Sequence, residues 1–180
     1  MIKCLLLSIF VGGHFSTPSK PDQKLDCYQI IDKVTDQTES ILKKRYKLRA
    51  IGVGGGITGR EQNLALELEY DQFVKQDQAR YLIVSAAEEY LKQLNAHTEL
   101  ENCKFKFPFT MNNLDMAVCF HQQPAYFAPP GELTWVSLDN NILRYSVRRG
   151  EYETECVLQE TFDEAKEKLK TYDPKASTNR

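Results

Sequence analysis

Apolar residues recur every three to four positions in several segments of the chain, which is the pattern of helices with one buried face. The segment 25–46 carries one such face, and the segment Gln78–Ala96 follows the pattern without interruption. Asp77 directly precedes the second segment and is its predicted N-cap. Thr161 and Glu164 form a capping-box pattern that predicts the start of a last helix.

Alternation of apolar and polar residues predicts strands elsewhere. It is clearest at 64–71, where leucine or tyrosine stands at every second position, although Leu, Ala and Glu also favour helices. The predicted strands are 49–53, 63–73, 114–120, 133–138, 142–148 and 152–158. Together these elements predict an α+β fold: a two-layer sandwich of a mostly antiparallel sheet with two to three helices on one face.

The ends of the chain differ in composition from its middle. Residues 1–16 place a lysine before a short apolar run, which predicts a signal peptide or an N-terminal apolar segment. The run is too short for the ~20 residues of a membrane-spanning helix, so we expect no transmembrane span in the mature chain. Residues 17–24 are a predicted linker, 25–171 a single α+β domain and 172–180 a disordered tail. We therefore expect a periplasmic or secreted protein.

The overall charge gives no attraction to polyanions. The 180 residues are 42% hydrophobic and 27% charged with a net charge of -2, which is ordinary for a globular domain. Five cations nevertheless fall close together: Lys43, Lys44, Arg45, Lys47 and Arg49. Cations near the C-terminal end of a helix interact favourably with the helix dipole. The cluster thus predicts a solvated helix end, and no clear nucleic-acid partner is expected.

Removal of the leader would leave four cysteines: Cys27, Cys103, Cys119 and Cys156. An even number in an exported chain permits two disulfides, and four cysteines allow three pairings. Buried reduced cysteines fit the sequence equally well, because free cysteine is commonly a core residue. The spacing does not decide between these alternatives.

Glycines are concentrated at 52–59, where Gly54, Gly55, Gly56 and Gly59 fall within a G-x-G-x-x-G match. In nucleotide-binding folds such glycines let the backbone approach a phosphate at a helix N-terminus. Here the following segment alternates like a strand, so the required helix is missing. A flexible hairpin connection, or a bulge where another backbone comes close, is the favoured interpretation, and a ligand-binding loop through Gly54, Gly55 and Gly56 is the alternative.

Reactive side chains occur on two predicted strands. Cys119 and His121 share a strand face, as a thiolate nucleophile and its base could, but the sequence names no third member. A core cysteine beside a rim histidine is the favoured interpretation. Glu67, Glu69 and Asp71 form an acidic row that predicts the solvated face of the sheet. We therefore expect no catalytic residue, no metal site and no cofactor.

The loop 122–132 is the best candidate for an interaction surface. It carries Tyr126 and Phe127 beside two consecutive prolines. Exposed aromatic side chains on a loop stiffened by proline lose little entropy on docking. The alternative is that both rings fold back onto the core.

Three stretches carry a resemblance to known proteins: KRYKLRAIGVGGG at 44–56, NLALELEY at 63–70 and ARYLIVSAAEEYLKQLN at 79–95. Over residues 41–169 the chain resembles a group of small exported proteins of unknown function from intracellular Gram-negative bacteria. The resemblance implies an envelope or secreted location. It implies no activity and no binding residue.

The sequence thus predicts an exported α+β domain that binds a protein or envelope partner without catalysis. The alternative is a small hydrolase or ligand-binding enzyme that uses the glycine-rich loop 52–59 together with Cys119 and His121.

Overall fold

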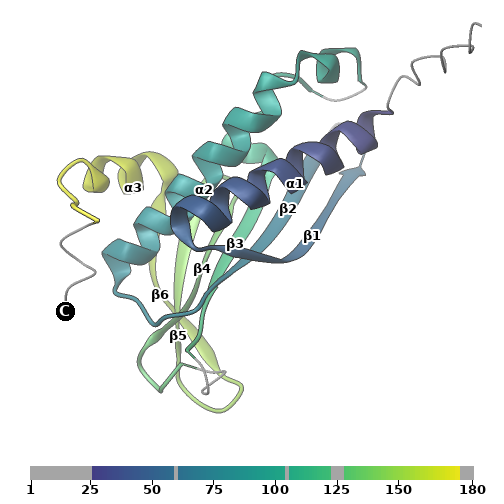
Figure 1. Cartoon of the computed structure of the whole chain (residues 1–180). Coiled ribbons are helices and arrows are strands. Elements are labelled where there is room, and N and C mark those ends of the chain that lie inside the picture. Colours follow the sequence, from purple (N-terminus) through teal and green to yellow (C-terminus); the bar gives the residue numbers. More distant parts are fainter. Residues whose placement is uncertain (1–25, 59–60, 104–105, 123–127, 175–180) are drawn as a thin grey trace, which may run out of the picture.

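The computed structural model describes residues 26–58, 61–103, 106–122 and 128–174. Within them the chain forms helices and strands in the predicted order (Figure 1), which confirms the α+β class. The elements are α1 (Cys27–Tyr46), β1 (Arg49–Thr58), β2 (Glu61–Tyr70), α2 (Gln76–Ala96), the short 3-10 helices Thr98–Asn102 and Met111–Asn113, β3 (Leu114–Phe120), β4 (Leu133–Asp139), β5 (Ile142–Arg148), β6 (Thr154–Thr161) and α3 (Phe162–Leu169).

The strands form a single sheet whose spatial order follows the chain, β1-β2-β3-β4-β5-β6. Neighbours are antiparallel except β2 and β3, which run parallel because α2 carries the chain back between them. In this pair Leu64 lies beside Leu114 and Tyr70 beside Phe120. The mostly antiparallel sheet predicted from the sequence is therefore present.

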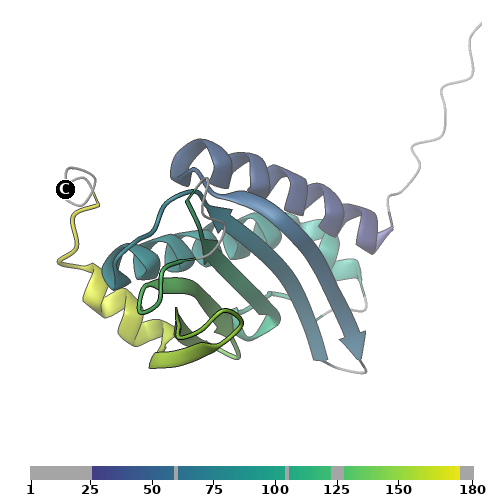
Figure 2. The same ribbon diagram turned by 90° about the horizontal axis from the view of Figure 1, so that it is seen from below.

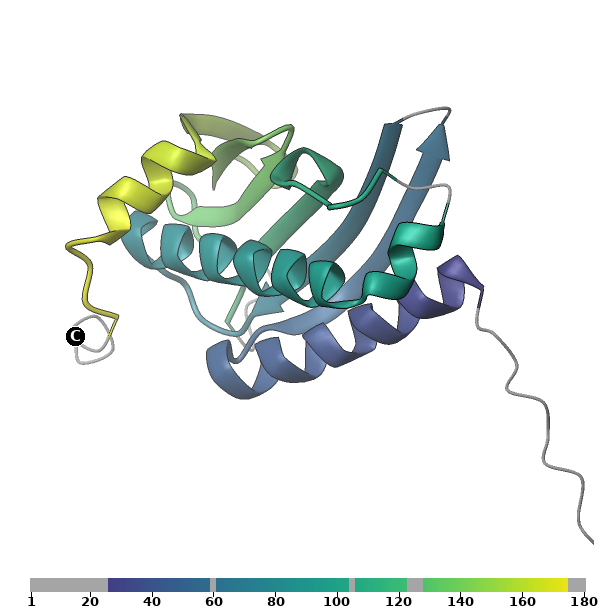
Figure 3. The same cartoon turned by 90° about the horizontal axis from the view of Figure 1, so that it is seen from above.

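The helices lie together over one face of the sheet (Figures 1 and 3). Strand residues buried in the core between the two layers include Leu66, Leu68, Met116, Val118, Val136, Leu138 and Leu143. The apolar face predicted for α2 is buried with them: Ala79, Leu82, Ile83, Ala86, Ala87, Tyr90 and Leu94. No described helix covers the opposite face, which Figure 2 shows from below. We call it the uncovered face.

The helix starts match the predictions unevenly. Thr161 and Glu164 form the predicted capping box at the start of α3. Asp77 is not the N-cap of α2, because the helix begins at Gln76 after Lys75, whose side chain makes no capping hydrogen bond. The carboxylate of Asp77 instead pairs with Arg80 within the first turn of the helix.

The glycines lie inside β1, so the predicted glycine-rich loop is wrong for the part of it that the structure describes. The strand does not end at Val53 but continues through Gly54, Gly55 and Gly56 and stays paired with β2. A Cβ atom on Gly55 would lie 2.7 Å from the backbone oxygen of Asn63, closer than real Cβ contacts. Glycine is therefore required there by the close approach of the neighbouring strand.

One disulfide joins the helical layer at one end. Cys27 at the start of α1 is bonded to Cys103, just after the 3-10 helix that follows α2, and their sequence separation is 76. Cys119 and Cys156 are free thiols. The sequence allowed either two disulfides or four reduced cysteines. The structure matches neither completely, because Cys27 and Cys103 form a disulfide while Cys119 and Cys156 remain thiols.

A buried charge network fastens the other end of the helical layer to the sheet. The side chain of Glu160 on β6 is only 2% exposed. It accepts hydrogen bonds from Arg80 Nε of α2 at 2.7 Å, the Tyr145 hydroxyl of β5 at 2.5 Å and Lys168 Nζ of α3 at 2.5 Å. Burial alone would raise the pKa of Glu160, but these hydrogen bonds outweigh it and hold the pKa below its usual 4.5.

We predict that Glu160→Gln lowers the free energy of unfolding by about 3 kcal/mol at neutral pH, because it removes the buried anion of Arg80 and leaves only the exposed carboxylate of Asp77 to pair with it. Since the pKa of Glu160 is lowered by folding, its contribution is present above pH 4.5 and is lost as the pH falls through the folded-state pKa. Urea unfolding at a series of pH values measures both effects.

The control for this measurement is Glu167→Gln, which removes an exposed carboxylate of α3 that pairs with Lys170. It should change stability by less than about 1 kcal/mol. Equal losses in the two variants would show that the buried network contributes no more than a surface ion pair.

We predict that the Cys27→Ala, Cys103→Ala double variant unfolds with a free energy about 2–5 kcal/mol lower than that of the parent, because the open chain gains conformational entropy when unfolded. A reducing agent should lower the melting temperature of the parent protein and leave that of the double variant unchanged. A parent protein insensitive to reductant would contradict the disulfide.

Candidate functional site

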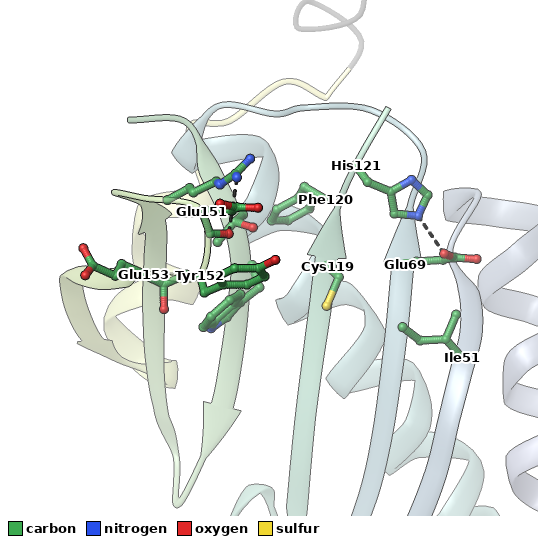
Figure 4. Close-up of a pocket in the computed structure, with 12 residues that line it drawn as sticks. Ile51, Glu69, Cys119, Phe120, His121, Glu151, Tyr152 and Glu153 are labelled. Atoms are coloured by element: carbon green, nitrogen blue, oxygen red, sulfur yellow. Dashed lines mark hydrogen bonds and ion pairs between the residues drawn. The ribbon is translucent and has the colours of Figure 1, made fainter. Parts of the chain in front are cut away.

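A pocket of about 350 Å³ lies on the sheet with residues from β1 through β6 in its walls. Figure 4 shows it in close-up. Its lining residues are Ile51, Glu69, Cys119, Phe120, His121, Thr134, Trp135, Arg148, Glu151, Tyr152, Glu153 and Thr154. The volume is at the lower end of the ~300–1,000 Å³ typical of small-molecule sites. The exposed surface of the walls is mostly apolar, although charged and polar residues are among the lining.

The parallel pairing of β2 and β3 assembles one end of the pocket. Glu69 is aligned with Cys119 in the parallel register, and the amide of His121 donates to the carbonyl oxygen of Tyr70 at 3.2 Å. His121 Nε2 lies 2.6 Å from Glu69 Oε2. Figure 4 shows the imidazole turned toward this carboxylate. The third group that the sequence could not name beside Cys119 and His121 is therefore Glu69.

The acidic row of β2 is only partly solvated, which corrects its prediction. Glu67 and Asp71 are exposed, whereas Glu69 is 7% exposed. The buried carboxylate has two partners, because Arg49 of β1 forms an ion pair with its second oxygen while His121 contacts the first. Asp71 Oδ1 lies 3.6 Å from His121 Nδ1. The imidazole therefore has a carboxylate beside each ring nitrogen.

The opposite end of the pocket is aromatic. Trp135 of β4 is half-buried, and Tyr152 is 86% exposed. The sequence predicted Tyr152 as the first residue of a strand, but β6 begins at Thr154 and Tyr152 lies in the preceding loop. In Figure 4 the Tyr152 ring reaches across the pocket toward Cys119, while the Glu153 side chain points away.

Arg148 holds the loop that presents Tyr152. Its Nε donates to the carbonyl oxygen of Gly150 at 2.7 Å, and its Nη2 donates to that of Glu151 at 3.3 Å. A third donor, Nη1, reaches the carbonyl oxygen of Ala128 at 3.1 Å. One guanidinium therefore fixes both the β5–β6 loop and the residue that follows the segment 123–127. Tyr152 is exposed, yet the backbone that carries it is well anchored.

The pocket does not have the arrangement that activates a cysteine. Burial raises the pKa of the Cys119 thiol, and the negative charges of Glu67 and Glu69 raise it further. Figure 4 shows the Cys119 side chain directed away from the His121 ring, which faces Glu69 instead. A nucleophilic cysteine needs a lowered pKa and a base within hydrogen-bond reach. The geometry therefore disfavours a thiolate mechanism.

The predicted pairing of a core cysteine with a rim histidine is reversed in the structure. Cys119 is half-buried and lines the pocket, and His121 is only 7% exposed. Among the described residues, no three histidine, cysteine, aspartate or glutamate side chains are grouped so that they could hold a metal ion.

The other predicted site residues lie elsewhere. Gly54 borders a second hollow of about 230 Å³ next to α1, which is lined by Ile31, Asp32, Thr35, Asp36, Val53, Gly54, Ala65 and Tyr90. Gly55 and Gly56 belong to β1 and do not line the main pocket. Tyr126 and Phe127 lie outside the described residues, so their proposed binding role stays a prediction.

The residues that give the pocket its aromatic character, Trp135 and Tyr152, were not among the predicted site residues. Trp135 is the only tryptophan of the chain, and its place within a predicted strand was a signal that could have singled it out. Tyr152 follows Gly150 by two residues, which could have indicated a turn tip rather than a strand start.

Comparison with known proteins adds no assignment: no protein-family model, no curated protein and no solved structure matches this chain. The helices in the described part of the chain are each too short or too polar to cross a membrane.

We predict that alkylating reagents modify Cys119 at least about tenfold more slowly than Cys156 at neutral pH, because its pKa is raised and its side chain is half-buried. Cys156 is exposed and serves as the internal control. Peptide mapping by mass spectrometry gives the two rates separately. A Cys119 that reacts as fast as Cys156 would revive the thiol-enzyme hypothesis.

Proposed function

We propose that this protein is an exported, non-catalytic binding domain that captures a protein partner on the uncovered face of its sheet. The observation that carries the proposal is the pocket on that face, with Trp135 in its wall and Tyr152 86% exposed above an anchored loop. An aromatic side chain held in solvent by a fixed backbone favours recognition, since few degrees of freedom are lost on binding.

The chemistry of the pocket supports binding over catalysis. Each nitrogen of His121 has a carboxylate neighbour, and the thiol of Cys119 has a raised pKa. These groups offer a polar anchor of fixed orientation, and the thiol with its raised pKa is not a nucleophile poised for reaction. Apolar walls with a few oriented polar groups are what ligand sites use for affinity and specificity.

Two features support export. Residues 1–16 have the composition of a signal peptide. The Cys27–Cys103 disulfide is the kind of bond that persists in oxidising compartments and is rare in the cytosol. The resemblance to small exported bacterial proteins agrees with this location.

Described residues on both sides of the segment 123–127 lie at or near the proposed binding surface. His121, directly before the loop 122–132, lines the pocket, and Ala128 within that loop is held by Arg148. His121 and Ala128, which lie on either side of the segment 123–127, are therefore placed by the pocket lining and by Arg148. This placement supports our proposal that Tyr126 and Phe127 contribute to the same contact with the partner.

We predict that a photo-crosslinking amino acid at position 152 forms an adduct with one defined protein in the cells that produce this chain. The same substitution at Tyr28, which is 61% exposed on α1, should form none. With the purified partner, Tyr152→Ala should weaken binding by about tenfold or more, as loss of an aromatic hot spot does.

Stability is the control for this experiment. Because Tyr152 is exposed, Tyr152→Ala should change the free energy of unfolding by no more than about 0.5 kcal/mol. The proposal fails if position 152 yields no adduct while position 28 does, or if Tyr152→Ala binds the partner with unchanged affinity.

A further inference from the structure

The shape of the pocket indicates the kind of group that enters it. Tyr152 and Ile51 stand on opposite sides with Cys119 between them (Figure 4), and Trp135, which also lines the pocket, is aligned with Cys119 on the neighbouring strand. Aromatic rings pack on other rings by stacking or edge contact more favourably than their buried area alone accounts for. Sulfur also makes favourable contacts with ring edges. The lining therefore prefers a flat aromatic group to an aliphatic one of equal size.

The charges around the pocket exclude an anion. Three carboxylates, Glu69, Glu151 and Glu153, line it against one guanidinium, Arg148, whose nitrogens already donate to backbone carbonyl oxygens. A carboxylate or phosphate would enter against these charges. A cation gains less than these carboxylates alone would give, because Arg49 pairs with Glu69 and Arg148 lines the same pocket. The group that fits best is uncharged.

The polar end of the pocket selects a hydrogen-bond donor. Glu69 is 7% exposed and its orientation is fixed by Arg49 on one oxygen and His121 on the other. A carboxylate has about four acceptor positions, so it can accept a further bond from a ligand N–H or O–H. Such a donor at the rim of an aromatic ring is what a phenol or an indole offers.

From these observations we propose that the pocket binds an uncharged aromatic ring with an O–H or N–H donor, supplied by a tyrosine or tryptophan side chain of the partner. The ring lies between Trp135, Tyr152 and Ile51, and its donor reaches Glu69. This inference rests on the proposed function, because it names the group by which the partner engages the uncovered face.

The single tryptophan makes the test direct. In a proton–nitrogen correlation spectrum of the labelled protein, only Trp135 contributes an indole N–H signal, and Trp135 lines the pocket. The probe is p-cresol, which is the tyrosine side chain without its backbone. We expect it to shift the Trp135 signal saturably with a dissociation constant of about 1 mM, as suits so small a ligand.

Three matched probes separate the parts of the inference. 4-Methylanisole lacks the donor, 4-methylcyclohexanol lacks the aromatic ring and 4-methylbenzoate carries a negative charge. Each should bind about fivefold or more weakly than p-cresol. Equal binding of 4-methylcyclohexanol overturns the aromatic requirement, equal binding of 4-methylanisole overturns the donor requirement, and equal binding of 4-methylbenzoate overturns the exclusion of anions.

Variants place the ring in the pocket. Tyr152→Ala should weaken p-cresol about fivefold, and the matched control Tyr28→Ala should leave it unchanged. Glu69→Gln should bring p-cresol to the affinity of 4-methylanisole. Should that variant unfold because Arg49 loses its partner, the comparison of the two probes on the parent protein still decides the role of the donor.

The source of the ring is tested with a capped tripeptide, glycine-tyrosine-glycine. Binding at least as tight as that of p-cresol supports a side chain of a protein partner. Binding of p-cresol with exclusion of the peptide overturns that source and identifies the ligand as a free small phenol. If no probe shifts Trp135 while position 152 still crosslinks to its partner, this inference fails and the proposed function stands. If both experiments are negative, both fail.

Discussion

The parallel pairing of β2 and β3 is the constraint on which the candidate site depends. Helix α2 returns the chain to the end of the sheet where β2 started, so β2 and β3 run in the same direction. Their C-terminal ends therefore lie side by side. Glu69 is thereby aligned with Cys119, and His121 lies just beyond the end of β3 beside Tyr70. In an antiparallel hairpin the C-terminal end of one strand lies beside the N-terminal end of the other, so Glu69 and His121 would be far apart. The same helix supplies much of the core, so the site and the fold share one element.

Because the helices pack on one face of the sheet, Trp135 lies on the face that no described helix covers. An uncovered sheet face normally carries polar side chains, and this one carries Glu67, Ser137 and Arg144. Trp135 interrupts that pattern with the largest apolar side chain in the chain, and Tyr152 stands exposed beside it at the same pocket. A half-buried tryptophan and an exposed tyrosine at one pocket add little to the core, and this is why our proposal places the partner there.

Features with a local signal were predictable from the sequence. The alternating segments at Leu114–Phe120 and Ile142–Arg148 match β3 and β5 at both ends, and Thr161 starts α3 with its capping box. The predictions fail where the local structure depends on contacts with residues that are distant in the sequence. The sequence allowed either a flexible connection or a close backbone approach at the glycines of β1, and only the position of β2 at Asn63 shows that the approach is real.

The candidate site was hidden for the same reason. Glu69 and His121 are 52 positions apart, so their pairing follows from strand register that a single sequence does not reveal. Periodicity could place Cys119 and His121 on one face, and it did. It could not show that a carboxylate from the neighbouring strand would turn the imidazole away from the thiol.

The Glu69 carboxylate favours the binding-domain hypothesis over the thiol-hydrolase hypothesis in this pocket. Activation of Cys119 needs a positive or basic neighbour that lowers its pKa, whereas Glu67 and Glu69 raise it. The buried Glu69 cannot be removed cheaply, because Arg49 and His121 are both oriented by it. A group that holds the polar end of the pocket rigid thus also keeps the thiol protonated. Rigidity with an inert thiol is a disadvantage for a hydrolase but an advantage for a binding site, since a preorganised acceptor loses little entropy when it meets its donor.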